Sequence, residues 1–317
     1  MSKRFVAGAL SAIGLSAIIN AQPPVVRTAD PLKRGMQLSD FPRTIKVTDN
    51  VYTYEDFHAG PEKFTTTNMF VVTDAGVLVA DGQGSVGETK GLVDAIRKVT
   101  TQPITTVVIA SDHGDHTAGN ASFPAGVHYL IHPTSKAILD RSAEAAAKAG
   151  RDSGWKLPAD AELVADKKSV RMGREEIQIL FLGRSHTGGD LAVYLPGQKI
   201  LFLSEIYLNR VFPAMRSAYP SEWLKALDKA EAMKAHIYIA GHGFTETGAV
   251  SQEEIRAYHK AMEAVIAEAT RLYKAGIPVD QAVKQANWGE YASWTLASSQ
   301  GPIAIRKVYE ELSGQLK

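Results

Sequence analysis

Residues 104–116 read ITTVVIASDHGDH, and this stretch decides the fold. Its first part, Ile104–Ala110, is a nearly continuous apolar run rich in β-branched residues, which is typical of a strand buried on both faces of a sheet. The run leads into a short turn that carries His113, Asp115 and His116. A buried strand that ends in three potential ligands indicates a metal site at that end of the strand.

Three further apolar runs in the sequence end in a similar way. His186 follows the run EIQILFL, Glu205 follows KILFLS, and His242 follows HIYIA. If these strands are neighbours that point the same way, the side chains after them meet at one edge of the sheet, where glycine-rich turns leave room for a ligand. Each histidine taken alone is more often a hydrogen-bonded structural residue than a ligand. The four strand ends together favour a metal site.

The ligand types limit the choice of metal. The chain contains no cysteine, so a metal must be held by histidine and carboxylate side chains. These ligands suit Zn²⁺, and also Fe²⁺ or Mn²⁺. A tight turn can direct His113 to one metal position and Asp115 with His116 to another nearby. A catalytic metal lowers the pKa of bound water to about 7, which gives a nucleophile at neutral pH.

The rest of the chain alternates short strands and helices in two similar halves. We expect strands at 45–47, 51–54, 68–73, 77–81, 104–110, 127–131, 176–182, 191–194, 199–204 and 236–240. We expect helices at about 88–99, 134–149, 221–234, 251–275 and 302–312. Ser251 and Glu254 predict a capping box at the start of the long fourth helix. This pattern predicts an α/β fold with two sheets packed face to face between helical layers.

Composition excludes several classes of protein. Of the 317 residues, 45% are hydrophobic and 22% charged, which rules out disordered, collagen-like and coiled-coil chains. The net charge is +1, so no strong field attracts nucleic acid or anionic lipid. We therefore expect a small-molecule substrate and no nucleic-acid partner. The sequence gives no indication of oligomeric state.

Residues 1–21 have the pattern of a bacterial signal peptide. Lys3 and Arg4 precede an uncharged apolar stretch, Phe5–Ile19, and small residues allow cleavage before Gln22. A single membrane anchor is the alternative, but the stretch is shorter than the roughly 20 residues that span a bilayer. We expect a periplasmic or secreted protein with no membrane contact after cleavage.

Three further segments follow the signal peptide. Residues 22–43 are Pro-rich and weakly patterned, so we expect an irregular arm. Residues 44–250 contain the expected strands and ligand candidates, and form the main domain. Residues 251–317 form a C-terminal helical extension packed on that domain.

The candidate ligands resemble the pattern of the metallo-β-lactamase-fold superfamily, in which H-x-H-x-D-H is followed by two more histidines in glycine-containing turns. His113, Asp115 and His116 match three of the four ligands of the first motif, while His186 and His242 match the later histidines. The resemblance extends in order over roughly residues 45–244. It implies an αββα sandwich of two mixed β-sheets, a metal site at one edge, and hydrolysis as the commonest activity.

Two smaller matches support the resemblance. Asn68, in TTTNMFVV, and Asp81, in VLVADGQG, stand where the family often has an Asn-bearing strand and a strand-ending Asp.

Ser111 departs from the family pattern, because it replaces the first histidine of the motif. A neutral hydroxyl is a poor zinc ligand, so the position of His113 and His186 loses one of its three expected histidines. We expect a weak or partial metal site there, with Ser111 beside the metal rather than bound to it.

Glu205 is the second departure, because the family usually has an aspartate there. Its longer side chain can still bridge two metals, or it can act as an acid or base. The position of Asp115, His116 and His242 is complete and is expected to bind one metal tightly. Either Asp115 or Glu205 would orient the attacking water.

Other candidates carry weaker signals. We expect Asp190 to hold the turn around His186 rather than to bind metal. Tyr207, Arg210 and Trp155 are weak candidates for substrate binding, as is Tyr219. His58 and His132 lie in loops near strand ends and could line the pocket, although a structural or surface role is favoured for both. His128, His236 and His259 are interpreted as structural.

The main functional hypothesis is an exported zinc-dependent hydrolase. In it, hydroxide generated by the metal attacks the carbonyl of a β-lactam, a lactone or an ester. One alternative is a metal-dependent lyase or oxidoreductase-type member of the fold, for which iron in place of zinc would be the sign. A non-catalytic periplasmic metal-binding module is the other alternative.

The signal-peptide pattern predicts that the mature protein starts at or near Gln22. Mass spectrometry of protein recovered from the periplasm of the native host would measure its N-terminus. Protein that still began at Met1 or Ser2 would contradict cleavage.

Overall fold

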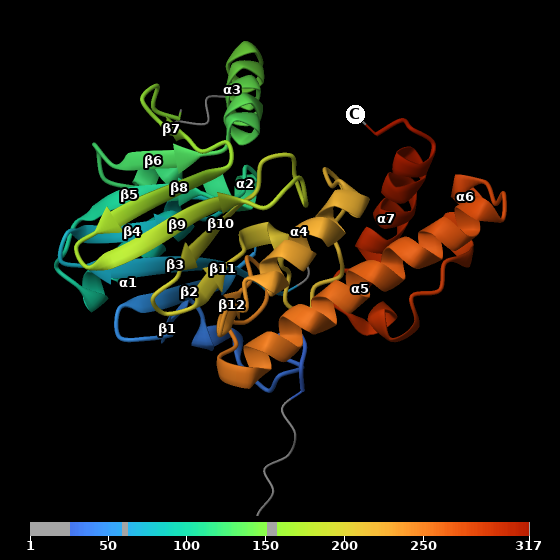
Figure 1. The fold of residues 1–317 in the computed structure, drawn as a ribbon, viewed down its shortest axis with the longest axis horizontal. Coiled ribbons are helices and arrows are strands. Elements are labelled where there is room, and N and C mark those ends of the chain that lie inside the picture. The colour runs from blue at the N-terminus through green and yellow to red at the C-terminus, as the bar shows by residue number, and fades with distance from the viewer. Residues whose placement is uncertain (1–25, 59–62, 151–156, 317) are drawn as a thin grey trace, which may run out of the picture.

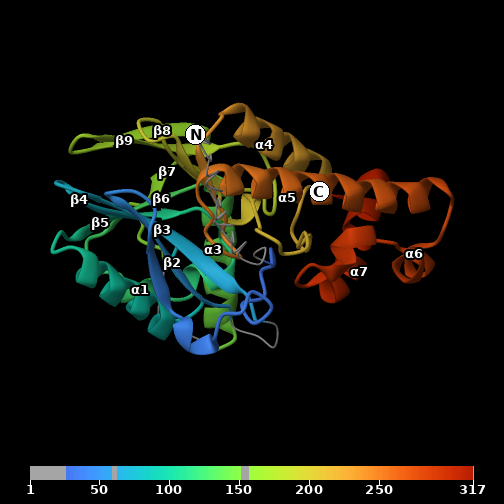
Figure 2. The ribbon, with the colours of Figure 1, turned by 90° about the horizontal axis from the view of Figure 1, so that it is seen from below.

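Two β-sheets pack face to face, and helices cover the outer face of each sheet (Figures 1 and 2). The computed structural model describes residues 26–58, 63–150 and 157–316, so the predicted signal peptide and Trp155 lie outside the described residues. Within this part of the chain, no helix is long and apolar enough to cross a membrane. The predicted αββα sandwich of two mixed sheets is confirmed.

The first sheet has seven strands in chain order among the described residues. They are β1 (Arg43–Lys46), β2 (Val51–Phe57), β3 (Thr65–Thr73), β4 (Gly76–Ala80), β5 (Ile104–Ile109), β6 (His128–Ile131) and β7 (Glu162–Leu163). Strands β1 to β4 pair antiparallel, whereas β4 to β7 pair parallel. The parallel part places the carboxyl ends of β4, β5 and β6 at one edge of the sheet.

The second sheet has five strands in the described residues, in the order β12-β11-β10-β9-β8. They are β8 (Lys167–Met172), β9 (Glu175–Phe181), β10 (Leu191–Leu195), β11 (Ile200–Phe202) and β12 (Ile237–Ile239). The pair β11 and β12 is parallel, and the other pairs are antiparallel. The residues that follow β11 and β12 therefore emerge at the same edge.

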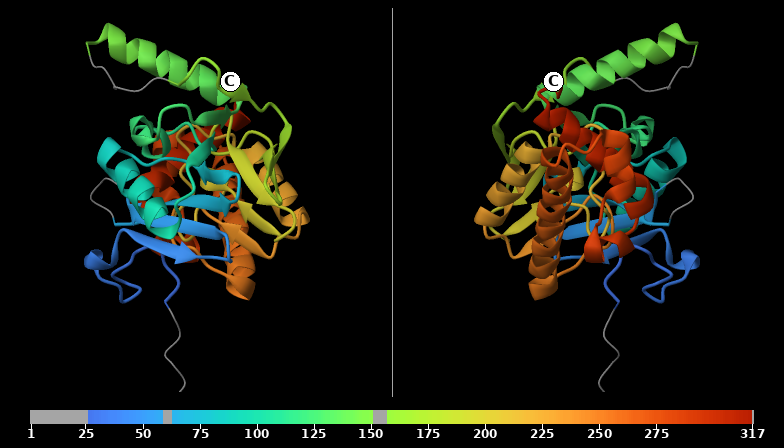
Figure 3. Two further views of the ribbon diagram at one scale, coloured as in Figure 1. Left: turned by 90° about the vertical axis from the view of Figure 1, so that its left-hand side faces the viewer. Right: turned by 90° about the vertical axis from the view of Figure 1, so that its right-hand side faces the viewer.

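Apolar side chains fill the space between the sheets and beneath the helices. Between the sheets, Val108 and Leu130 belong to the same buried cluster as Ile179 and Val193. The helices are α1 (Val86–Val99), α2 (Gly114–Thr117), α3 (Pro133–Lys148), α4 (Pro220–Ala232), α5 (Gly248–Lys274), α6 (Val279–Gln285) and α7 (Ala297–Leu312). Helix α1 covers the first sheet, while α4 and α5 cover the second (Figure 2). Helix α3 buries only Ser135 and extends beyond the body of the molecule (Figure 3).

Backbone hydrogen bonds join the two sheets at the edge where the candidate ligands lie. The N–H of Leu191 donates to the carbonyl of Ala110 at 2.8 Å, which connects the start of β10 to the end of β5. The N–H of Thr67, in β3, donates to the carbonyl of Gly241 at 2.7 Å, just after β12. These bonds hold the strand ends of both sheets together before any ligand binds.

The predicted capping box at Ser251 and Glu254 is wrong. Helix α5 begins at Gly248, so both residues lie within its first turns. The Ser251 hydroxyl accepts from the N–H of Tyr238 at 2.6 Å, and the Glu254 carboxylate pairs with Arg210. Both side chains therefore connect α5 to the rest of the molecule.

Among the elements that the sequence pattern also missed are β7, β8 and α6. Strand β8 alternates exposed and half-buried residues at the end of its sheet, and α6 has only seven residues. Each buries too little apolar surface to give a clear periodic signal.

Candidate metal centre

Asp81 positions the turn that carries the first candidate ligands. It follows β4 with a left-handed backbone, φ 64°, and its Oδ1 accepts hydrogen bonds from the N–H groups of Ala110 and Ser111 at 2.7 and 3.2 Å. Its Oδ2 accepts from the hydroxyl of Ser204 at 2.5 Å and lies 3.2 Å from Nδ1 of His116. One buried carboxylate thus connects the ends of β4, β5 and β11.

The first ligand group consists of Asp115, His116, Glu205 and His242, whose potential ligand atoms all lie within 4.8 Å of one another. Oδ2 of Asp115 lies 3.1 Å from Nε2 of His242 and 3.6 Å from Nε2 of His116. Oε1 of Glu205 lies 3.4 Å from Nε2 of His242. The position expected to bind metal tightly therefore has a fourth potential ligand.

The second ligand group consists of His113, His186 and Glu205, again within 4.8 Å. Nδ1 of His113 lies 3.1 Å from Oε2 of Glu205, and Nδ1 of His186 lies 3.0 Å from Oε1. Glu205 thus belongs to both groups. The position that Ser111 was expected to leave with two histidines has a carboxylate as its third potential ligand.

Contacts on the far sides of the histidine rings fix which nitrogen faces the group. Nδ1 of His242 lies 3.0 Å from the carbonyl of Thr65, and Nδ1 of His116 faces Asp81. Such contacts leave Nε2 of each ring directed at Asp115 and Glu205. The ring of His186 stacks on Trp223, with ring centroids 5.2 Å apart.

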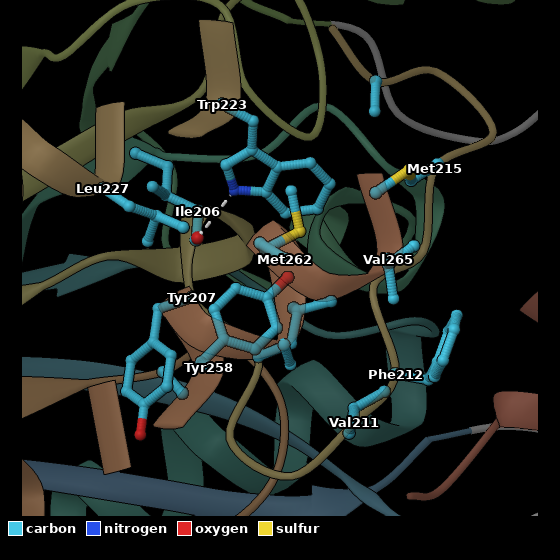
Figure 4. Packing of buried hydrophobic residues seen from close by; sticks show 14 of the residues in the cluster. Ile206, Tyr207, Val211, Phe212, Met215, Trp223, Leu227, Tyr258, Met262 and Val265 are labelled. Carbon is cyan, nitrogen blue, oxygen red and sulfur yellow. Dashed lines mark hydrogen bonds between the residues drawn. The ribbon is translucent and has the colours of Figure 1, made fainter. Parts of the chain in front are cut away.

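Glu205 is held by the short 3₁₀ turn η3 (Ser204–Ile206) and by a hydroxyl. The indole N–H of Trp223 donates to the carbonyl of Ile206 at 2.8 Å, which attaches this turn to α4 (Figure 4). The Ser111 hydroxyl donates to Oε2 of Glu205 at 2.5 Å. The Ser111 hydroxyl therefore lies beside the ligand candidates, and its contact is with the carboxylate.

The donor set fits a divalent metal. Both groups combine imidazole nitrogen with carboxylate oxygen, the ligands that Zn²⁺, Fe²⁺ and Mn²⁺ accept in proteins. Nδ1 of His186 is buried and makes no hydrogen bond of good geometry among the described residues, as expected of a nitrogen that binds a metal.

The pKa values in the metal-free cluster shift toward the charged forms of both residue types. The negative charge of Glu205 raises the pKa of His113 to about 10. Burial alone would lower the pKa of His242, but hydrogen bonds to Asp115 and Glu205 outweigh it and raise the value to about 10. Burial opposes ionisation of Glu205, yet the charges of His186, His113 and His116 hold its pKa well below the usual range. Protonated histidines thus supply the positive charge that a bound metal would otherwise supply.

A pocket of about 160 Å³ opens onto the cluster. One set of lining residues consists of the candidate ligands His113, Asp115, His186, Glu205 and His242, together with His58. The other set consists of Phe64, Leu208, Val211, Ala214, Arg216, Leu296 and Gln300. The second set comes from the residue before β3, the segment before α4, and the start of α7. A small molecule in this pocket would contact the ligand groups and the C-terminal extension together.

The weak substrate-binding candidates that the structure describes do not line this pocket. Tyr207 is buried against Tyr258, and Arg210 pairs with Glu254 over the ring of Trp294. Tyr219 precedes α4 and lies beneath the guanidinium of Arg184. Their closeness to Glu205 in the sequence was misleading, because Leu208 and Val211 from the same segment line the pocket, whereas the side chains of Tyr207 and Arg210 contact other parts of the protein.

His58 does line the pocket, contrary to the structural or surface role that was favoured. Its Nδ1 lies 3.3 Å from Oδ2 of Asp115, and its ring stacks on Phe64. No motif surrounds His58, so only the pairing of β2 with β3 reveals its place.

The other predicted supporting residues lie outside the cluster. Asp190 accepts hydrogen bonds from Ser185 and from Thr187, and so holds the turn that carries His186. Nδ1 of His132 accepts from the N–H of Thr134 at the start of α3. His128 and His259 contact carboxylates outside the cluster, and His236 is exposed.

Two curated relatives are similar to this chain over most of their own length. The chain is 26% identical to the metallo-beta-lactamase IND-1 of Chryseobacterium indologenes, over 65% of this chain and 84% of the relative. It is 22% identical to the 2,4-dinitroanisole O-demethylase subunit alpha of a Nocardioides species, over 93% of this chain and 83% of the relative. No family model matches the chain.

Solved structures show the same fold. A metallo-beta-lactamase from Pontibacter korlensis covers 70% of this chain and 98% of its own, with a TM-score of 0.58 and 20% identity. The sec-alkylsulfatase Pisa1 from a Pseudomonas species covers 89% of this chain and 52% of its own, with a TM-score of 0.67 and 16% identity. The alkylsulfatase match leaves about a tenth of this chain uncovered, and residues 248–317 make up more than that share. The likeness therefore includes part of the C-terminal helices.

Metal binding to the metal-free protein should release protons at pH 7, because the pKa values of His113 and His242 are about 10. Apparent affinity should therefore rise with pH toward 10, since fewer protons then compete with the metal. Isothermal titration calorimetry in buffers of different ionisation enthalpy measures the release directly. Affinity that does not change with pH would contradict this protonation state.

Replacement of Ser111 by alanine should weaken metal binding by about 10- to 100-fold, the usual effect of losing a contact that orients a ligand. The physical reason is the lost hydrogen bond to Glu205. Ser251→Ala is a matched control, because it removes a buried hydroxyl that bonds to Tyr238 instead. Equal affinity of Ser111→Ala and the unmodified protein would show that Ser111 does not position Glu205.

Proposed function

We propose that this chain is an exported zinc-dependent hydrolase of a small carbonyl compound, because it shares the fold of metallo-β-lactamases and has a metallo-β-lactamase among its curated relatives. The proposed substrate classes are β-lactams, lactones and esters. Export to the periplasm or the medium rests on the N-terminal pattern of Lys3, Arg4 and the apolar run after them.

The observation that carries the proposal is the position of Glu205. Its buried carboxylate belongs to both ligand groups, and both groups open onto one pocket. When bound there, a divalent metal would supply a nucleophile from water at neutral pH and act as a Lewis acid. His113, His186 and Glu205 would hold one metal, while Asp115, His116, His242 and Glu205 would hold another.

Asp115 is better placed than Glu205 to orient the attacking water. Its side chain is 20% exposed and lines the pocket, whereas the side chain of Glu205 is 3% exposed. A carboxylate that water can reach accepts a hydrogen bond from that water and directs its lone pair at the substrate. His58 contacts Asp115 and the pocket, so it can pass a proton between this carboxylate and solvent.

The relatives that cover most of the chain favour a second candidate, hydrolysis of a sulfate ester or an aryl ether. The likenesses to the alkylsulfatase and to the O-demethylase subunit extend over about nine tenths of this chain. In this chain the pocket includes Leu296 and Gln300, beyond the segment that contains the ligand groups. A sulfate ester or an aryl ether is therefore the second candidate substrate class.

Replacement of His242 by alanine should remove a tightly held metal and reduce turnover more than about 100-fold, since even residues that only support ligands contribute 10- to 100-fold. Metal content is measured by mass spectrometry on protein purified without added metal. Turnover is measured on a panel of a β-lactam, a lactone, a carboxylic ester, an alkyl sulfate and an aryl methyl ether. His236→Ala, an exposed histidine outside the cluster, is the matched control.

Three outcomes would overturn parts of this proposal. Full metal content and full turnover in His242→Ala would contradict the assigned ligands. Metal binding without turnover on any member of the panel would favour the non-catalytic module. Iron in place of zinc, with no hydrolysis, would favour the lyase or oxidoreductase-type alternative.

A further inference from the structure

The side of the pocket that the ligand candidates do not supply is built mainly from two segments that are distant in sequence. The N–H of Phe212 donates to the carbonyl of Thr295 at 2.8 Å, and Val211 pairs with Thr295 in a parallel bridge. These contacts fix the start of α7 beside the segment that follows η3. The pocket therefore depends on the C-terminal extension for its shape.

This side of the pocket is mainly apolar. Leu208 and Val211 are each 1% exposed, and Phe64 is 4% exposed. Leu296 has a left-handed backbone, φ 69°, which is strained for a residue that carries a side chain. Strain of this kind is concentrated at binding sites, where the surrounding structure enforces it.

Arg216 is the only lysine or arginine among the described residues that line the pocket. It is exposed, and no described residue forms a hydrogen bond or ion pair with its side chain. By contrast, the nearby Arg184 and Arg210 are each paired with a carboxylate. The guanidinium of Arg216 is thus free to bind an anionic group on a molecule in the pocket.

Gln300 provides a second polar contact on the same side. Its Oε1 is buried and has no hydrogen-bond partner in the described part of the chain. A buried amide oxygen without a partner destabilises the fold, so its presence in a pocket indicates a partner supplied by a ligand.

We propose that the substrate carries an anionic oxygen group at the end remote from the reacting bond, and that Arg216 binds this group. Gln300 forms a hydrogen bond with the part of the substrate that lies between its two ends. The proposal rests on the proposed function, because it takes the ligand groups as the place of reaction. A substrate of this class has an apolar middle that contacts Leu208, Val211 and Leu296, with polar ends that face the ligand groups and Arg216. Arg216 and Gln300 thereby determine specificity.

Binding of small carboxylates to the protein as purified tests this proposal without requiring turnover. The probes are succinate, glutarate and adipate, each compared with the monocarboxylate of equal length, namely butyrate, pentanoate and hexanoate. The members of each pair differ in one terminal carboxylate, and the three lengths cover different spacings between the cluster and Arg216. Dissociation constants are measured by calorimetry.

We expect at least one dicarboxylate to bind about 10-fold more tightly than the monocarboxylate of equal length, because a hydrogen bond to a charged group increases affinity by about that factor. Arg216→Gln should remove this difference, whereas Arg174→Gln, an exposed arginine in the turn between β8 and β9, should retain it. The proposal is overturned if no pair differs, or if the difference persists in Arg216→Gln.

Gln300→Met separates a ligand contact from a structural one. The variant removes the unpartnered oxygen while keeping the side-chain length, so thermal stability should be equal or higher while the preferred dicarboxylate binds more weakly. Lower stability with unchanged binding would overturn the role of Gln300. Loss of the dicarboxylate preference in Arg216→Gln, together with no hydrolysis on the substrate panel, would support the binding site and contradict the proposed function.

Discussion

The carboxylate of Asp81 is the constraint on which the candidate centre depends. It accepts hydrogen bonds from the turn after β5 and from Ser204 after β11, and it faces His116. Its left-handed backbone is supported by Asn68, whose amide donates to the carbonyls of Asp81 and Gly82 at 3.0 and 2.7 Å. Buried charge is costly unless it is fully hydrogen-bonded, and Asp81 meets this condition by joining three strand ends. The ligand candidates are therefore positioned by the scaffold before a metal binds.

A second constraint follows from the charge of the cluster. Glu205 and Asp115 lie among four histidines in a mostly buried site, and protonated histidines balance the carboxylates when metal is absent. Such a cluster is compact without metal because opposite charges attract at short range. A metal that binds must therefore displace protons from the histidines. It does not need to draw the ligand side chains together, because they are already close. The hydroxyl of Ser111 fits this arrangement, since it donates to Glu205 without adding charge.

The strands and the ligand candidates were predictable because both depend on local sequence. An apolar β-branched run that ends in a histidine or a carboxylate indicates a strand end, and parallel neighbours bring such ends together. Arg216 and Gln300 gave no comparable signal, because their place depends on how α7 packs against the segment after η3. Tyr207 was a candidate because it is near Glu205 in the sequence, yet the 3₁₀ turn directs it into the core.

The structure thus assigns different parts of the pocket to different parts of the chain. Turns that follow strands of the two sheets carry the candidate ligands, which determine the class of chemistry. Segments outside the sheets, including the start of α7, supply Arg216, Leu296 and Gln300, which contact the rest of a bound molecule. Likeness to β-lactamases over about two thirds of the chain therefore bears on the chemistry at the ligand groups. It does not determine the substrate, because substrate choice depends on side chains that the shared fold does not fix.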